Sequence, residues 1–331
     1  MLSFRVLSIF EVNEEQLWIT HFEAVFYTVS QVVAGKTLLV DLPAQYGMYS
    51  EILKPIFSVI GLSVLNFTAV MAFLQIIGML ALLWLCLRLI KNNILKFFCV
   101  ASLCLLMGET WRLRLSMVTG NYFDVVYQVW PLRFVFPALS LCVFYALQKH
   151  SKSYSAIILM AGFSGLAIVG NLDSGIPVFG AFLAYLFLRF VFPIDESRGQ
   201  VTKKTLLAIM VVLIGVISFG MYLQLKAGQA IQWQDWMKYQ RIFYQTGFGM
   251  LPLPINTLHP WMAIIGVYVF AITGALSRRM QRKPALIWDL LFFMAIGILD
   301  SLHFKQNGDT PAHNDIISVM DYIATPLREH S

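Results

Sequence analysis

The chain has 331 residues, of which 58% are hydrophobic and 13% are charged, and its mean hydropathy is +0.70. This composition excludes an ordinary soluble domain, because too much of its surface would be apolar. The net charge of +6 does not indicate a nucleic-acid partner, since Lys and Arg collect in the cytoplasmic loops of membrane proteins.

Residues 1–65 are expected to form an external loop with helices that lie at the membrane interface. Residues 22–33 have an amphipathic pattern that Gly35 would end, and residues 48–65 hold a second apolar stretch that closes at Gly61. We expect no upstream helix that carries the N-terminus across the membrane, so either residues 1–20 insert partially or a first span is lacking. We therefore expect a chain that is shortened or begins at a misplaced start codon, and a shortened product could be inactive.

Apolar runs between residues 66 and 303 predict about eight transmembrane helices, since a span needs roughly 20 apolar residues. With residues 1–65 and an external tail at residues 304–331 they form one integral membrane domain. The predicted fold class is thus all-α, a polytopic transmembrane helical bundle. The expected spans are residues 66–90, 94–107, 130–147, 155–169, 176–192, 205–223, 261–276 and 285–299.

Basic residues occupy every second connection between these runs, which places those connections in the cytoplasm. The other connections and both chain ends then share the opposite face, together with an aromatic-rich loop at residues 224–260. The basic groups are Arg88, Lys91 and Lys96; Lys149 and Lys152; Arg198, Lys203 and Lys204; and Arg278, Arg279, Arg282 and Lys283.

Two carboxylates in the first external loop are the candidate catalytic groups. Asp41 lies just before Leu42 and Pro43, on a segment that the proline keeps extended, where it could take a proton from a sugar hydroxyl or hold a divalent metal. From the local residues alone, an aspartate that caps a turn explains it better. Glu23 follows His21 by two residues, so the two do not share a helix face, and Glu23 matters only if Asp41 is near.

Arg133 is the most informative basic residue, because it lies a few residues into an apolar run, where a charge needs a role or a partner. Its planar fork suits a lipid phosphate, and the alternative is a snorkelling arginine or an internal ion pair, for example with Asp124. Arg112 and Arg114 are weaker candidates of the same kind.

Two further groups of acidic and amide residues have a structural alternative to a functional role. Asn171 and Asp173 lie in a Gly-bounded polar turn at residues 170–175 and could simply shape it. Asp289 and Asp300 fall in the last predicted span, so each should be paired or functional. The chain has no Gly-rich phosphate loop, HExxH motif or nucleophile elbow, which leaves a soluble-type nucleotide-sugar enzyme unsupported.

Three segments in this order resemble the polytopic glycosyltransferases of the GT-C fold, particularly bacterial membrane proteins related to dolichyl-phosphate-mannose-protein mannosyltransferases. The first external loop is similar to that family's "H-E … G-K … D … Q-Y-G" run. A "P-x-R-x-x-x-P" segment and an "N-L-D-T-G"-like turn follow. The residues that carry the likeness are His21, Glu23, Gly35, Lys36, Asp41, Gln45, Tyr46 and Gly47; Pro131, Arg133 and Pro137; and Asn171, Leu172, Asp173, Ser174 and Gly175.

The resemblance implies an inverting sugar transfer in a multi-pass protein of the bacterial inner membrane. A polyprenyl-phosphate sugar would be the donor and a glycan, lipid or protein on the outer face the acceptor, with no nucleic acid involved. It implies Asp41 or Glu23 as the base and Arg133 at the lipid phosphate, with His21, Tyr46, Arg112, Asn171 and Asp173 also binding substrate. No cofactor is certain, although a divalent metal is possible. The family's first span and its downstream segments have no counterpart here, which agrees with a chain shortened at both ends.

Two other classes stay open at this point. A transporter or flippase of lipid-linked glycans should line several spans with charges at mid-depth, whereas an enzyme should gather its charges around one external cavity. A polysaccharide polymerase or ligase would share the membrane, the donor lipid and the face, and the sequence does not separate it from a glycosyltransferase.

Overall fold

The computed structural model describes residues 22–109, 131–150, 152–194, 196–238, 241, 260–281 and 289–296. Over these residues the chain is helical, and its one β pairing is an isolated bridge between Leu38 and Leu42. The all-α prediction is thus confirmed for this part of the chain. The named helices are α3 (Ala24–Val33), α4 (Tyr49–Ile60), α5 (Val64–Leu89), α6 (Asn93–Glu109), α8 (Val135–Lys149), α9 (Tyr154–Gly170), α10 (Leu172–Val191), α11 (Arg198–Ala227), α12 (Trp233–Trp236) and α14 (Pro260–Met280).

A helix occurs at each of the eight predicted runs, the last represented by residues 289–296. Three of the described helices, α5, α10 and α11, are long and apolar enough to cross a membrane. α8 and α9 are apolar but shorter, with 15 and 17 residues. Large apolar side chains on outward faces, such as Phe97 and Phe98 of α6, are more than half exposed, as lipid-facing positions would be.

Helix α9 lies at the centre of the bundle and packs against α8, α10 and α11, while α5 packs on α8. Gly175 lets α9 and α10 approach closely, because a Cβ there would collide with the backbone of Ile168. The largest apolar cluster includes Phe144, which stacks on Phe293 and meets Tyr185 edge to face. Aromatic pairs in these two geometries are favourable, so the cluster joins α8 and α10 to residues 289–296.

Three predicted helix starts are wrong by four residues or more. α8 begins at Val135 rather than at residue 130, and the errors for α11 and α10 have a local cause. α11 begins at Arg198 rather than at residue 205, because Ser197 and Gln200 form a capping box ahead of the apolar run. α10 begins at Leu172 rather than at residue 176, because the Asn171 side chain caps the helix by accepting from the Ser174 amide. The predicted polar turn at residues 170–175 is therefore a helix cap followed by the first turn of α10.

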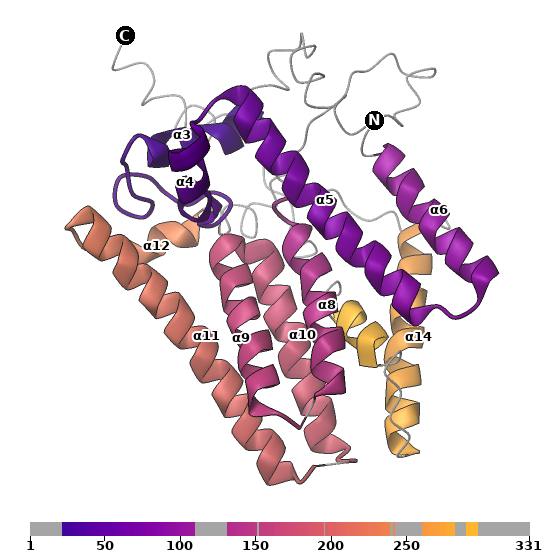
Figure 1. Ribbon diagram of the computed structural model, residues 1–331. Helices are drawn as coiled ribbons and strands as arrows, with labels where there is room; N and C mark the ends of the chain where they lie inside the picture. The colour runs from indigo at the N-terminus through magenta and orange to yellow at the C-terminus, as the bar shows by residue number, and fades with distance from the viewer. Residues whose placement is uncertain are drawn as a thin grey trace, which may run out of the picture.

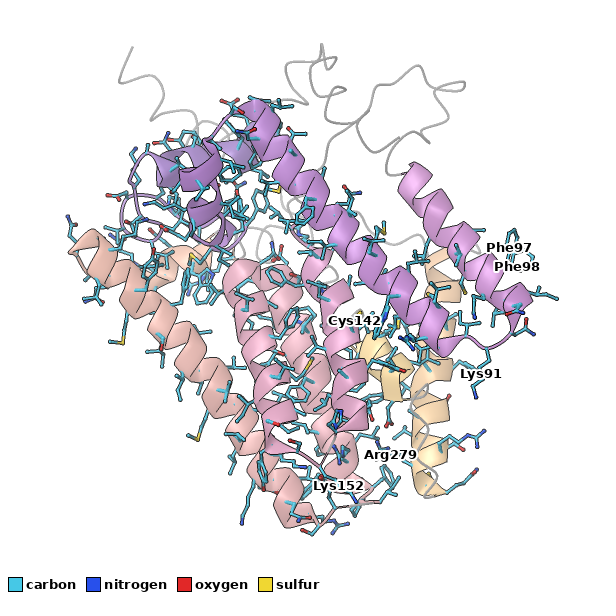
Figure 2. All side chains as sticks on the ribbon, viewed as in Figure 1. Lys91, Phe97, Phe98, Cys142, Lys152 and Arg279 are labelled. Atoms are coloured by element: carbon cyan, nitrogen blue, oxygen red, sulfur yellow. The ribbon has the colours of Figure 1, made fainter. Side chains whose placement is uncertain are left out.

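The helices divide the described chain into two ends (Figure 1). The segment from α3 to α4 and the short helix α12 lie together at one end, called here the loop end. The α8–α9 and α10–α11 connections lie at the other, called the basic end, with the C-terminal part of α14. The labelled side chains of Lys152 and Arg279 lie at this basic end (Figure 2). Two of the basic connections expected in the cytoplasm thus share one end of the bundle with the basic end of α14.

Candidate functional site

The first external loop docks onto the junction between α9 and α10. The Met48 amide donates to the Val169 carbonyl over 2.8 Å, and the Asn171 Nδ2 donates to the Tyr46 carbonyl over 3.0 Å. Between these two bonds Gly47 adopts a φ of +90°, and a Cβ at Gly47 would lie 2.8 Å from the Asn171 Cα. Only glycine fits this close approach with that backbone, so Tyr46 and Gly47 are fixed against Asn171.

Arg133 joins the same group through an ion pair with Asp173. Its Nη2 and Nε donate to the single oxygen Oδ2 of Asp173, over 2.7 and 3.0 Å. The Arg133 Cζ also lies 6.0 Å from the ring centroid of Tyr46, within the range of a cation–π contact. Four residues that the sequence predicts to bind substrate, Tyr46, Arg133, Asn171 and Asp173, thus come together from three separate segments.

This group remains reachable from outside, which a purely structural ion pair would not need. The side chains of Arg133 and Asp173 are 37% and 26% exposed. A guanidinium has five N–H donors, and two of those of Arg133 reach Asp173, so further donors exist for a second anion. Because Arg forks match phosphate oxygens, the arrangement can bind a lipid phosphate without dismantling the pair.

The apolar support beneath the group comes from α3 and α5. Phe22, Tyr46, Phe67 and Leu132 belong to one buried cluster, in which Phe22 and Phe67 meet edge to face at 5.6 Å. The buried Tyr49 hydroxyl ties α4 to α3 by donating to the Val25 carbonyl over 2.8 Å. Burial raises the pKa of Tyr49 above its ordinary value, so this phenol stays protonated and structural.

Asp41 is an exposed turn residue in the structure. Its Oδ2 accepts a hydrogen bond of 2.7 Å from the Thr37 amide, and its own amide donates to the Thr37 carbonyl over 2.9 Å. This is the capped turn that the sequence offered as the alternative to a catalytic role. The two explanations are compatible, because one carboxylate oxygen accepts the cap and the exposed side chain can still meet an acceptor.

The other predicted carboxylate, Glu23, is exposed immediately before α3. Its neighbour Phe22 packs in the same apolar cluster as Tyr46 and Leu132. The ion pair of Arg133 in the structure is nevertheless with Asp173, not with Glu23 or Asp41. His21, Arg112, Arg114 and Asp124, which the sequence also singled out, lie outside the described residues.

A divalent metal at Asp41 was one of the options raised by the sequence. A hard cation such as Ca²⁺ takes six or more oxygen ligands, several of them carboxylates. Over the described ranges, no group of three or more His, Cys, Asp or Glu side chains forms a candidate metal site. A divalent metal at Asp41 therefore stays a prediction.

One buried ion pair at the loop end was missed by the sequence reasoning. The Lys226 Nζ, at the end of α11, lies 2.8 Å from both carboxylate oxygens of Glu51, whose side chain is fully buried. The apolar stripe of α4 runs through Tyr49, Leu53 and Phe57, at a spacing of four. Glu51 falls off that stripe, and 175 positions separate it from Lys226, so no local signal announced the contact.

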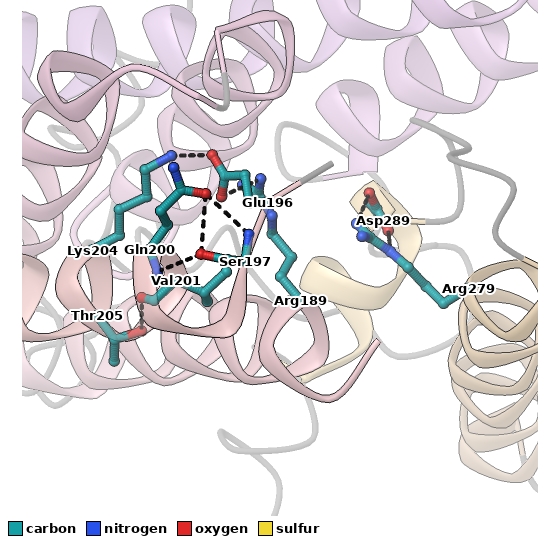
Figure 3. Close-up of polar contacts among 9 residues, drawn as sticks. All are labelled: Arg189, Glu196, Ser197, Gln200, Val201, Lys204, Thr205, Arg279 and Asp289. Carbon is teal, nitrogen blue, oxygen red and sulfur yellow. Dashed lines mark hydrogen bonds and ion pairs between the residues drawn. The ribbon is translucent and has the colours of Figure 1, made fainter. Parts of the chain in front are cut away.

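The basic end holds a contrasting set of charges (Figure 3). Glu196 pairs with both Arg189 and Lys204, and Arg279 pairs with Asp289 through two hydrogen bonds of 3.2 and 2.6 Å. The prediction that Asp289 is paired or functional is confirmed in its first form, while Asp300 lies outside the described residues. All five side chains are at most 8% exposed. Lys204 is thus a buried member of this cluster rather than a loop charge.

Comparison with known proteins adds no assignment: no family model matches the chain, and neither a curated protein nor a solved structure matches it significantly.

Proposed function

We propose that this chain is a polytopic membrane glycosyltransferase of the GT-C type, with about eight spans, in the inner membrane of a bacterium. It moves a sugar from a polyprenyl-phosphate donor to a glycan, lipid or protein acceptor on the external face. The observation that supports this most is the convergence of Tyr46, Arg133, Asn171 and Asp173 at the loop end, opposite the α8–α9 and α10–α11 connections. All four are among the residues that carry the resemblance.

In the proposed reaction, the acceptor hydroxyl attacks the anomeric carbon from the face opposite the phosphate. The bond between the anomeric carbon and the phosphate oxygen breaks, the configuration inverts, and the polyprenyl phosphate leaves with the bonding electrons. Asp41 takes the proton of the hydroxyl, with Glu23 as the alternative base. The Arg133 guanidinium stabilises the charge that develops on the leaving phosphate. Asp173 orients that guanidinium, and Asn171 holds Tyr46 beside it.

The distribution of charge along the helices favours this enzyme over a transporter or flippase. In α5, α8, α9, α10, α11 and α14, every Asp, Glu, Lys and Arg lies within the first two or last two helical turns. A polar path across the bilayer would instead need charged groups at mid-depth. A polymerase or ligase acting on the same lipid-linked donor would use the same chemistry and remains an alternative within this class.

The test is transfer of radiolabelled sugar by the full chain in proteoliposomes, with a panel of polyprenyl-phosphate hexoses as donors and lipid, glycan and peptide acceptors. We expect a labelled product from one of these donors. Asp41→Asn should lower the rate by about 10²–10⁴-fold, because the general base is lost, with membrane insertion unchanged.

Full activity of the Asp41→Asn protein would remove Asp41 from the mechanism. Glu23→Gln would then test whether Glu23 is the base. Movement of intact donor between leaflets without any transfer would instead support the flippase.

A further inference from the structure

The segment that carries Asp41 makes two long-range hydrogen bonds, one with Lys226 of α11 and one with Glu51 of α4. The Lys226 Nζ donates to the Lys36 carbonyl over 3.0 Å, at the start of the segment. Glu51 Oε1, which Lys226 also contacts, accepts from the Leu38 amide over 3.1 Å. Asp41 closes its turn through a hydrogen bond from the Thr37 amide. The two long-range bonds hold Lys36 and Leu38, the residues on either side of Thr37.

A third contact fixes the far side of the same turn. The Gln232 amide, in the segment between α11 and α12, donates to the Leu39 carbonyl over 2.8 Å. Leu38 and Leu39 are themselves about 1% exposed and pack in one buried cluster with Leu223 of α11. The turn is therefore attached to the C-terminal part of α11 both by hydrogen bonds and by apolar packing.

The backbone of this turn is strained, which indicates that the surrounding contacts impose its shape. Leu39 has a φ of +65°, in the left-handed region that non-glycine residues rarely adopt. Such conformations persist only where neighbouring structure over-determines them, and they gather at functional sites. Here the strained residue lies two positions before Asp41, and the groups that hold it are Glu51, Lys226 and Gln232.

We propose that the buried Glu51–Lys226 ion pair positions Asp41. The pair fixes residues 36–41 and so determines the location of the Asp41 carboxylate at the loop end. This inference rests on the proposed function, since it assigns Glu51 and Lys226 to the placement of the base. Neither is a catalytic residue: Glu51 is fully buried, and the Lys226 Nζ is engaged by Glu51 and Lys36.

The pair suits this task better than a surface salt bridge would. An ion pair excluded from water holds its partners in one geometry, because breaking it leaves a buried charge without compensation. The pair also joins α4 to the end of α11, two elements that enclose the turn from different parts of the chain. A small displacement of a catalytic group can lower a rate by about 100-fold, so an anchor of this kind would be felt in catalysis.

The experiment uses the double variant Glu51→Gln/Lys226→Met, which removes both charges together and leaves no orphan charge to unfold the protein. Lys226→Arg is the conservative variant, because a guanidinium can still reach both Glu51 oxygens. Lys203→Met is the matched control, since Lys203 is exposed on the same helix at its other end. All are full-length chains in proteoliposomes.

Two readouts are compared: hydrogen exchange of the amides of residues 37–41, and kcat and KM for sugar transfer from the polyprenyl-phosphate hexose that the wild type uses. The double variant should exchange these amides at least about 10-fold faster, as expected when local protection is lost. Its kcat should fall by about 10–100-fold with a nearly unchanged donor KM, because the base is misplaced while the phosphate site is intact. Lys226→Arg should restore both, and Lys203→Met should change neither.

Faster exchange in the double variant with an unchanged kcat would overturn the positioning role and leave the proposed function standing. Unchanged exchange would show that the pair does not hold the turn, and would also overturn the proposal. A wild-type chain that transfers no sugar from any donor of the panel would overturn the proposed function, and the positioning role in catalysis would fall with it.

Discussion

The loop end and the basic end of the bundle both contain clustered charges, but they treat them differently. At the basic end, Arg189, Glu196, Lys204, Arg279 and Asp289 are almost fully buried, and each cation is paired with one of the two carboxylates. At the loop end, the Arg133–Asp173 pair is about one-third exposed and touches an aromatic ring and a docked loop. The exposed fraction of the paired side chains thus distinguishes ion pairs that hold helices together from an ion pair that a ligand can reach.

The helices that the basic-end charges join support a structural role for this cluster. Glu196 connects the end of α10 with the start of α11, and Arg279 connects α14 with residues 289–296. The cation of Arg189 and that of Arg279 both lie over the Tyr185 ring, at 5.6 and 5.8 Å from its centroid. These contacts hold four helical segments together at the basic end. They leave little exposed surface for a substrate.

The largest effect on this comparison should come from Glu196→Gln. Removing the carboxylate that Arg189 and Lys204 share takes an anionic partner from two buried cations, which should lower the free energy of unfolding by about 3–5 kcal/mol. Thermal melts in detergent measure this, with Lys203→Met as an exposed control. Transfer activity per folded molecule should stay unchanged. A loss of activity without a loss of stability would contradict the structural role of the basic end.

Gly47→Ala tests the docking of the loop at the other end. The substitution combines a strained positive φ with a clash against the backbone of Gly170 and Asn171. The cost should be about 2–4 kcal/mol, from strain and overpacking together. Limited proteolysis of the loop should rise, and sugar transfer should fall, because Tyr46 leaves Arg133. Gly35→Ala is the comparison, since Gly35 also has a positive φ but nothing within 4 Å of its Cβ position.

Arg133→Met should separate binding from stability. Its pair with Asp173 is partly exposed, so the free energy of unfolding should change by less than about 1 kcal/mol. Loss of the guanidinium at the leaving phosphate should lower kcat/KM by about 10–100-fold, as expected for a charge-assisted contact. Arg198→Met, at an exposed position, is the matched control. A large fall in melting temperature with normal transfer would place Arg133 among the structural charges instead.

The smallest effect concerns Lys54, near the Glu51–Lys226 pair. Burial, followed by repulsion from Lys226, lowers the pKa of Lys54 from its usual 10.5. Above the lowered pKa the folded protein has released a proton that the unfolded chain keeps until 10.5, so stability should rise with pH over that interval. Lys54→Met should remove this small rise and slightly stabilise the protein at neutral pH. Melting curves between neutral pH and pH 10.5 check it, and an unchanged slope would contradict it.

Part of this arrangement follows from the sequence, and the rest depends on contacts that no local pattern reveals. Apolar runs located every described helix of the bundle, and the motifs around Tyr46, Arg133 and Asn171 pointed to residues that the fold brings together. The start of α10 was missed because an Asn-Leu-Asp-Ser-Gly string fits a turn as well as a capped helix.

The buried ion pairs were missed for a different reason. Glu51 and Lys226 are far apart in the chain, and Lys204 resembles an ordinary cytoplasmic loop charge until Glu196 is seen beside it. Whether a lysine is buried depends on what folds over it, and that is a property of the tertiary structure rather than of its neighbours in sequence.

The central claim, that the exposed Arg133–Asp173 pair of the loop end acts on a substrate while the buried charges of the basic end hold the bundle, is tested most directly by one paired measurement. Sugar transfer and melting temperature are recorded together for Arg133→Met and Glu196→Gln. We predict lost transfer with retained stability for the first, and retained transfer per folded molecule with lost stability for the second. The reverse pattern, or equal effects of both variants on transfer, would contradict the account.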